Sequence, residues 1–110
     1  MLSEETRHRR LAKNERLIRE TNWETRTLAA DSGATADEEL ELWCACGRAD
    51  CATRLLMTLG EYSAVHAHPH RFIVAPGHAD TAIETVIEHV SGYDVVEKRP
   101  EYQAADRTTR

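Results

Sequence analysis

Three cysteines lie within eight positions of one another, and this cluster constrains the fold more than any other feature of the sequence. They are Cys44, Cys46 and Cys51. Their number is odd and no secretory signal precedes them, so we expect a reducing compartment and no disulfide framework. Clustered thiols in such a compartment more often hold a metal ion, and the Cys-x-Cys-x4-Cys spacing lets three thiolates converge through one turn at Gly47. We therefore predict a Zn²⁺ site; three buried or free cysteines without a metal are the alternative.

A structural zinc site needs a fourth ligand, and the chain has six histidines. His78 directly follows Pro76-Gly77, a turn that can hold the imidazole ring in a fixed orientation. His70, and after it His68, are the alternatives. The predicted ligands are Cys44, Cys46, Cys51 and His78. Three thiolates and one imidazole close the coordination sphere and leave no position for a substrate, which indicates a structural metal and points away from an enzyme.

A run of histidines, His66-Ala67-His68-Pro69-His70, superficially resembles the start of a metallohydrolase site. Residues two apart face away from each other on a helix, and Pro69 interrupts the geometry further. Polar residues at a helix end are the simpler interpretation. A metal-dependent hydrolase that uses this run is therefore kept only as an alternative function.

The hydrophobic pattern predicts an α+β fold, in which an N-terminal helical arm is followed by a small zinc-stabilised antiparallel sheet with one short helix. Ser3 is a suitable cap for the long helix, and Thr58 begins a capping box with Glu61. A helix over residues 80–89 competes with the first strand of the predicted hairpin. The expected elements are a helix at 4–30, strands at 39–46 and 53–57, a short helix from Thr58 to His68-Pro69, a strand at 71–75, and a hairpin of strands 83–90 and 93–98.

These elements divide the chain into four segments within the size of one domain. We expect a helical arm over 1–30, a linker over 31–37, a zinc-binding α+β domain over 38–99 and a frayed polar tail over 100–110. No window of about 18 apolar residues predicts a membrane span. The charged start of the chain is not followed by the apolar stretch that an export signal requires. The expected location is cytoplasmic.

Charge is distributed unevenly, although the chain carries 14 basic and 19 acidic residues and a net charge of -5. The basic side chains concentrate in the arm, where they and one tryptophan are the predicted partner-binding residues. These are Arg9, Arg10, Arg16, Arg19 and Trp23. A solvated helix face with pairs such as Arg16–Glu20 is the alternative. Interleaved acidic residues favour a protein partner over nucleic acid, and nothing predicts membrane contact. The thin apolar stripe of the arm also offers a weak homodimer contact.

Several pieces of the chain together resemble a family of short actinobacterial proteins. The matching pieces are Arg10-Leu11-Ala12-Lys13-Asn14-Glu15 with Arg19-Glu20, Cys44-Ala45-Cys46 with Cys51, Leu59-Gly60-Glu61-Tyr62 with Val65, residues 71–78, and residues 92–98. The resemblance implies that the Cys-x-Cys, Cys and Pro-Gly-His positions act together, which favours His78 as the fourth ligand. It implies no activity.

The function expected from these features is that of a non-enzymatic, zinc-stabilised binding module. The expected partner is a macromolecule, and we expect a protein in transcription, signalling or stress regulation. A thiol-based redox sensor at the zinc site is the first alternative, and the hydrolase is the second.

Overall fold

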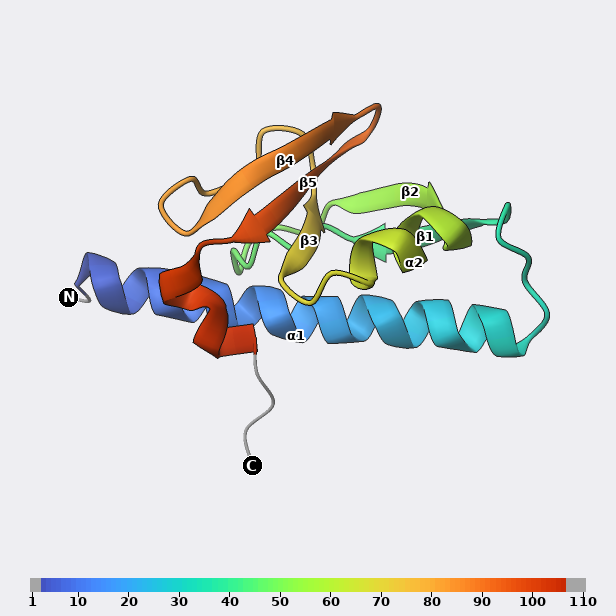
Figure 1. Cartoon of the computed structure of the whole chain (residues 1–110), viewed down its shortest axis with the longest axis horizontal. Coiled ribbons are helices and arrows are strands. Elements are labelled where there is room, and N and C mark those ends of the chain that lie inside the picture. The colour runs from blue at the N-terminus through green and yellow to red at the C-terminus, as the bar shows by residue number, and fades with distance from the viewer. Residues whose placement is uncertain (1–2, 107–110) are drawn as a thin grey trace.

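A single long helix runs along one side of the protein, and the sheets lie against its other side (Figure 1). The computed structural model describes residues 3–106. Along the chain it contains α1 (Glu4–Asp31), β1 (Glu39–Trp43), β2 (Arg54–Thr58), α2 (Leu59–His66), β3 (Arg71–Val74), β4 (Glu84–Val90), β5 (Tyr93–Lys98) and the 3-10 helix η1 (Pro100–Asp106). This order confirms the predicted fold class, with two antiparallel sheets in the sheet region. Within the described residues, no helix is both long and apolar enough to cross a membrane.

The two sheets differ in how they are buried. β1 and β2 form an antiparallel pair in which buried and exposed residues alternate, as the period-two pattern predicts. The second sheet has the order β3-β5-β4, with a register shift between Val86 and Glu88 on β4. Its central strand β5 is buried at most positions, whereas the edge strand β4 is mostly exposed. Both sheets contribute to one apolar core, which includes Leu42, Tyr62 and Phe72.

The helix α1 is attached to the sheets mainly through polar side chains. Its fully buried residues are Ala12, Glu15 and Asn22. The Asn22 carboxamide donates a hydrogen bond to the Trp43 carbonyl and accepts one from the Trp43 amide, each at 2.9 Å. Asn22 thus continues the hydrogen bonding of β1 onto the helix. Ser3 caps α1 by accepting from the Thr6 amide, as predicted. The division of the chain into arm, linker, domain and tail stays a prediction.

Two expectations about local structure need correction, and one alternative is excluded. The strand predicted over 39–46 ends at Trp43, because the following backbone turns toward the second sheet and the Ala45 amide donates to the Ile73 carbonyl at 2.8 Å. The competing helix over 80–89 does not form, since residues 84–90 pair with β5. Residues 100–106 are not frayed: they form η1 and bury Tyr102 against α1, whereas 107–110 lie outside the described residues.

Candidate metal centre

Four ligating side chains meet at the edge of the sheet region. They are Cys44, Cys46, Cys51 and His78, and their ligand atoms all lie within 4.8 Å of one another. The His78 Nδ1 atom is 3.5 Å from the Cys44 sulfur and 3.7 Å from the Cys51 sulfur. A tetrahedral zinc ion with Zn–S of about 2.3 Å and Zn–N of about 2.05 Å separates sulfur from nitrogen by about 3.6 Å. The separations of the His78 nitrogen from the Cys44 and Cys51 sulfurs fit that geometry.

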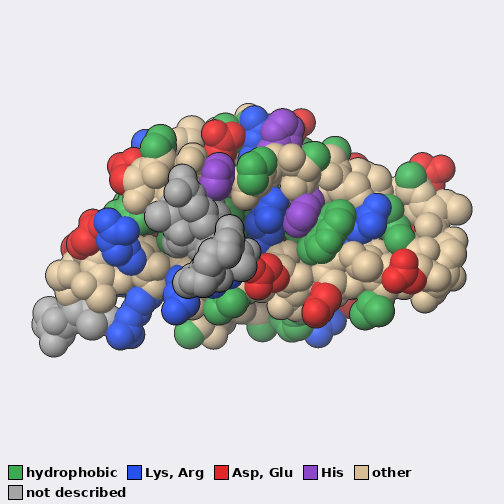
Figure 2. Space-filling model, turned by 60° about the horizontal axis from the view of Figure 1, so that its bottom comes forward, with side chains coloured by type: hydrophobic (Ala, Val, Ile, Leu, Met, Phe, Trp, Pro, Cys, Tyr) green, Lys and Arg blue, Asp and Glu red, His purple; other side chains and the backbone are tan. Residues whose placement is uncertain are grey.

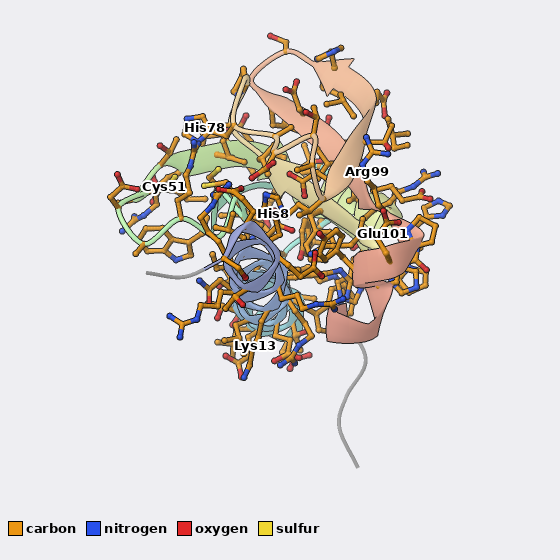
Figure 3. The ribbon with its side chains drawn as sticks, turned by 90° about the vertical axis from the view of Figure 1, so that its left-hand side faces the viewer. His8, Lys13, Cys51, His78, Arg99 and Glu101 are labelled. Carbon is orange, nitrogen blue, oxygen red and sulfur yellow. The ribbon has the colours of Figure 1, made fainter. Side chains whose placement is uncertain are left out.

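Two loops that are far apart in the sequence bring these ligands together. The three cysteines lie in the metal loop, residues 44–53, which connects β1 to β2. The metal loop is anchored to the second sheet at its first cysteine, because the Ala75 amide donates to the Cys44 sulfur at 3.1 Å. His78 lies in the connection after β3, in a turn closed by its own amide donating to the Ala75 carbonyl. Figure 3 shows Cys51 and His78 close together beside the N-terminal part of α1.

Gly47 lets the metal loop pass directly over α1. Its φ of +80° lies in the left-handed region, and a Cβ there would lie 2.6 Å from the Leu11 carbonyl oxygen. The Asn14 carboxamide, on the next turn of α1, donates to the Gly47 carbonyl at 3.0 Å. The helix therefore fixes the path of the backbone between the second and third cysteines.

The three thiols have different surroundings. Burial raises the pKa of Cys44 to about 12. Burial also acts to raise the pKa of Cys51, but hydrogen bonds from Thr53 and from the Cys46 and Cys44 side chains together lower that pKa to about 6. A bound divalent cation would deprotonate all three thiols, as coordinating cations do. Arg48 lies beside the cluster, where its hydrogen bond to Cys46 raises the pKa of the guanidinium and supplies a compensating positive charge.

The geometry thus gives a Cys3His cluster able to hold a metal ion. Comparison of the chain with protein-family models, with curated proteins and with solved structures finds no match. The resemblance to short actinobacterial proteins consequently stays a prediction, and the cluster is interpreted from its own geometry.

The histidine run does not contribute to this cluster. Among the residues that the structure describes, His78 rather than His70 or His68 joins the three sulfurs, and no second ligand group is found at the run. His66 instead stacks on Trp23 with ring centroids 3.9 Å apart. Burial, reinforced by the positive charge of Arg19, lowers the pKa of His66 to about 4. These surroundings favour an uncharged packing residue over a ligand.

The residues predicted to bind a partner occupy two kinds of environment. Arg9 and Arg10 are exposed, and Arg16 forms the expected pair with Glu20 at 2.8 Å. Arg19 points inward and donates hydrogen bonds to three backbone carbonyls between the end of α2 and the start of β3, those of His66, His68 and Arg71. The structure therefore uses Arg19, together with Trp23, inside the fold, and a partner contact stays a prediction for all five predicted residues.

Sequence reasoning missed the buried charges that hold α1 in place. Lys98, on β5, pairs with Glu15 of α1, and both side chains are inaccessible to solvent. Glu84 is buried beside them, at the start of β4. No local pattern reveals this triad, because each member resembles an ordinary surface residue in its own segment.

Proposed function

We propose that the protein binds one Zn²⁺ at Cys44, Cys46, Cys51 and His78, and that this metal stabilises a non-enzymatic binding module. The observation that carries the proposal is the convergence of four ligand atoms within 4.8 Å from two separate loops. Soft thiolates with one imidazole are the ligand set of structural zinc sites. All four tetrahedral positions are supplied by side chains, so a bound ion has no position left for a substrate or a reactive water.

Metal analysis of the freshly reduced protein tests the zinc site. We expect one zinc per chain, and a tetrahedral cobalt spectrum after Co²⁺ replaces it. His78→Ala removes a ligand and should lower the metal content and the Tm. His70→Ala is the matched control, because it changes a histidine outside the cluster. Well under one equivalent of metal in the wild-type protein, or full metal retention by His78→Ala, would contradict the proposal.

A macromolecular partner, namely a protein, is the second part of the proposal. It is supported by the exposed basic side chains near the start of α1, among them Arg9 and Arg10. Deleting α1 would remove part of the core, so substitutions are the better test. We expect the combined change of Arg9, Arg10 and Arg16 to Glu to abolish co-purification of a protein from the native cell, and Arg54→Glu on β2 to preserve it. Equal recovery with the triple variant would exclude this surface.

Redox sensing by the same thiolates is a second candidate, favoured by the accessibility of Cys51. Cys51 is only partly buried, and cavities of about 390 Å³ and 230 Å³ both reach it. Hydrogen peroxide would take two electrons from a pair of thiolates and two protons from solvent, giving one disulfide and two molecules of water, and the loss of two ligands would release Zn²⁺. Stoichiometric zinc release at modest peroxide, reversed by dithiothreitol, is the expected result. Retention of zinc and of all three thiols under these conditions would exclude sensing.

A further inference from the structure

The solvent-facing side of α1 carries a regular stripe of exposed residues, of which Asn14 also hydrogen-bonds the metal loop at the Gly47 carbonyl. Seven exposed residues follow one another at alternating spacings of four and three, as in a coiled-coil seam. This outer stripe consists of Arg10, Asn14, Leu17, Thr21, Glu24, Leu28 and Asp31. It lies opposite the face that buries Ala12, Glu15 and Asn22. Figure 1 shows the sheets and α2 on one side of α1, and the stripe residues other than Asn14 and those beside the metal loop are open to solvent.

Two leucines stand out in this stripe. Leu28 is 67% exposed and Leu17 is 46% exposed, and Leu28 is the most exposed large hydrophobic residue in the described part of the chain. They are separated by 11 positions, which is three helical turns or about 16.5 Å along the axis. Figure 2, turned toward this side, shows hydrophobic side chains among charged ones along the lower edge.

A cavity lies beside the first of these leucines. It has a volume of about 390 Å³, and its apolar lining includes Leu17, Ile18 and Trp43. The Arg54 guanidinium lies 4.3 Å from the centre of the Trp43 ring and helps to fix that wall. The metal loop forms the opposite wall. Each molecule therefore presents a partly apolar hollow beside the stretch of the stripe from Asn14 to Thr21, and a protruding leucine, Leu28, three turns after Leu17.

We propose that two copies of this chain associate through α1 in antiparallel orientation, so that Leu28 of each copy enters the cavity beside Leu17 of the other. A two-fold axis between Thr21 and Glu24 brings both leucine–cavity contacts into register at once. Such an isologous interface uses the same patch on both copies and closes as a dimer. The inference goes beyond the proposed function, since it concerns a second copy and not the metal or another partner.

The charges of the helix select the antiparallel orientation. The N-terminal half of the stripe region carries Arg10 and Lys13, and the C-terminal half carries Glu24 and Asp31. Figure 3 shows Lys13 on the side of α1 that faces away from the sheets. In the antiparallel register, Asp31 of one copy lies opposite Asn14 and next to Lys13 of the other. In a parallel register, each of these residues would instead lie opposite the same residue of the other copy, and like charges would repel.

The polar residues in the stripe make this a weak interface. Only two of its seven positions are large and apolar, and the contact is confined to one helix face and one cavity. Interfaces of this size form transient complexes that appear as the protein concentration rises. Association should accordingly be visible as a concentration-dependent equilibrium.

Sedimentation equilibrium of the full, zinc-loaded chain tests the contact between about 10 μM and about 1 mM. The weight-average mass should rise from 12.4 kDa toward twice that value. Leu28→Ser should weaken dimerisation by about tenfold or more. Leu56→Ser is the matched control, because Leu56 is 60% exposed on β2, outside the stripe, and its loss should leave the equilibrium unchanged. A constant mass of 12.4 kDa, or equal effects of the two substitutions, would overturn the proposal.

Exchanging the charges at Lys13 and Asp31 tests the antiparallel orientation of the two helices. Lys13→Glu and Asp31→Lys should each weaken dimerisation by about threefold to tenfold, because each creates two like-charge contacts in the symmetric dimer. The double variant restores opposite charges and should dimerise within about twofold of the wild type. In a parallel dimer, like charges would still face each other in the double variant, and dimerisation would not recover. Failure of the double variant to recover dimerisation therefore rejects the antiparallel arrangement.

Discussion

At the scale of single residues, Gly47 determines whether the cysteines can converge. It must adopt a positive φ, and it must approach α1 so closely that no side chain fits. The positive φ disfavours any residue with a Cβ. The close approach to α1 leaves no room for a Cβ, because the nearest atom is a backbone oxygen, which cannot move aside as a side chain can. The sequence indicated the tight turn. The contact with Leu11 could not be predicted, since nothing local shows that the helix passes there.

Gly47→Ala should therefore destabilise the protein more than the same change at another positive-φ glycine. We expect a loss of about 2–4 kcal/mol, which combines backbone strain with displacement of the loop from α1. Gly92→Ala is the control, because Gly92 has a φ of +97° in the β4–β5 turn and open space around its Cβ position. That change should cost about 1 kcal/mol. Equal losses in urea unfolding would show that the close contact with Leu11 does not matter.

At the scale of elements, α1 is held to the second sheet by three buried ionisable side chains, Glu15, Glu84 and Lys98. Lys98 lies against Glu15, donates to the Ala12 carbonyl at 3.2 Å and lies 4.1 Å from the Phe72 ring centre. Burial, and then the negative charge of Glu84, raises the pKa of Glu15 well above its usual value. Burial also raises the pKa of Glu84. One lysine cannot neutralise two buried carboxylates, so the folded state retains a proton that the unfolded chain releases.

This retained proton predicts a loss of stability with rising pH. An unfolded glutamate loses its proton near pH 4.5, whereas the folded pair keeps one at higher pH. Since the unfolded chain then binds fewer protons, the free energy of unfolding falls as the pH rises above 4.5 toward the raised pKa, by up to about 1.4 kcal/mol per pH unit. Glu84→Gln keeps an acceptor for the Asp80 amide and removes the excess charge, so its profile should be flatter.

Urea unfolding of zinc-loaded protein across this pH range measures the effect. The metal ligands are shared by wild type and variant, so their protonation cancels in the difference between the two curves. Glu39→Gln, at an exposed position of β1, controls for the loss of one carboxylate and should follow the wild-type curve. Parallel curves for wild type and Glu84→Gln would show that the triad holds no extra proton.

The same elements show how far the sequence predicts this fold. Local patterns sufficed for α1, for the capping box at Thr58 and for the β4–β5 hairpin, because caps, turns and alternation act over a few residues. The end of β1 and the packing of η1 depend on contacts between distant segments. The metal centre could be predicted from the sequence because its three cysteines are close together in the chain. The buried triad could not be predicted, since its members belong to α1, β4 and β5.

At the scale of the whole molecule, a metal ion at the cluster would join the two sheets. The cysteines follow β1 of the first sheet, and His78 follows β3 of the second. Much of the apolar core lies between the strands and away from the metal loop, including Phe72 and Val96. The β4–β5 hairpin also retains its own ladder of paired residues. Loss of the metal should consequently loosen the two ligand loops before it unfolds the second sheet.

Hydrogen exchange with and without a chelator tests this order of unfolding. Removing the metal leaves three thiols and one imidazole without the ion that draws them together, so the amides of residues 44–53 and 75–79 should exchange at least tenfold faster. The amides of β5 should stay protected, because they are bonded on both sides to β3 and β4. His68→Ala, which changes an exposed histidine outside the cluster and retains the metal, should match the wild type throughout. If β5 loses protection together with the metal loop, the ion supports the entire fold and not only the junction between its sheets.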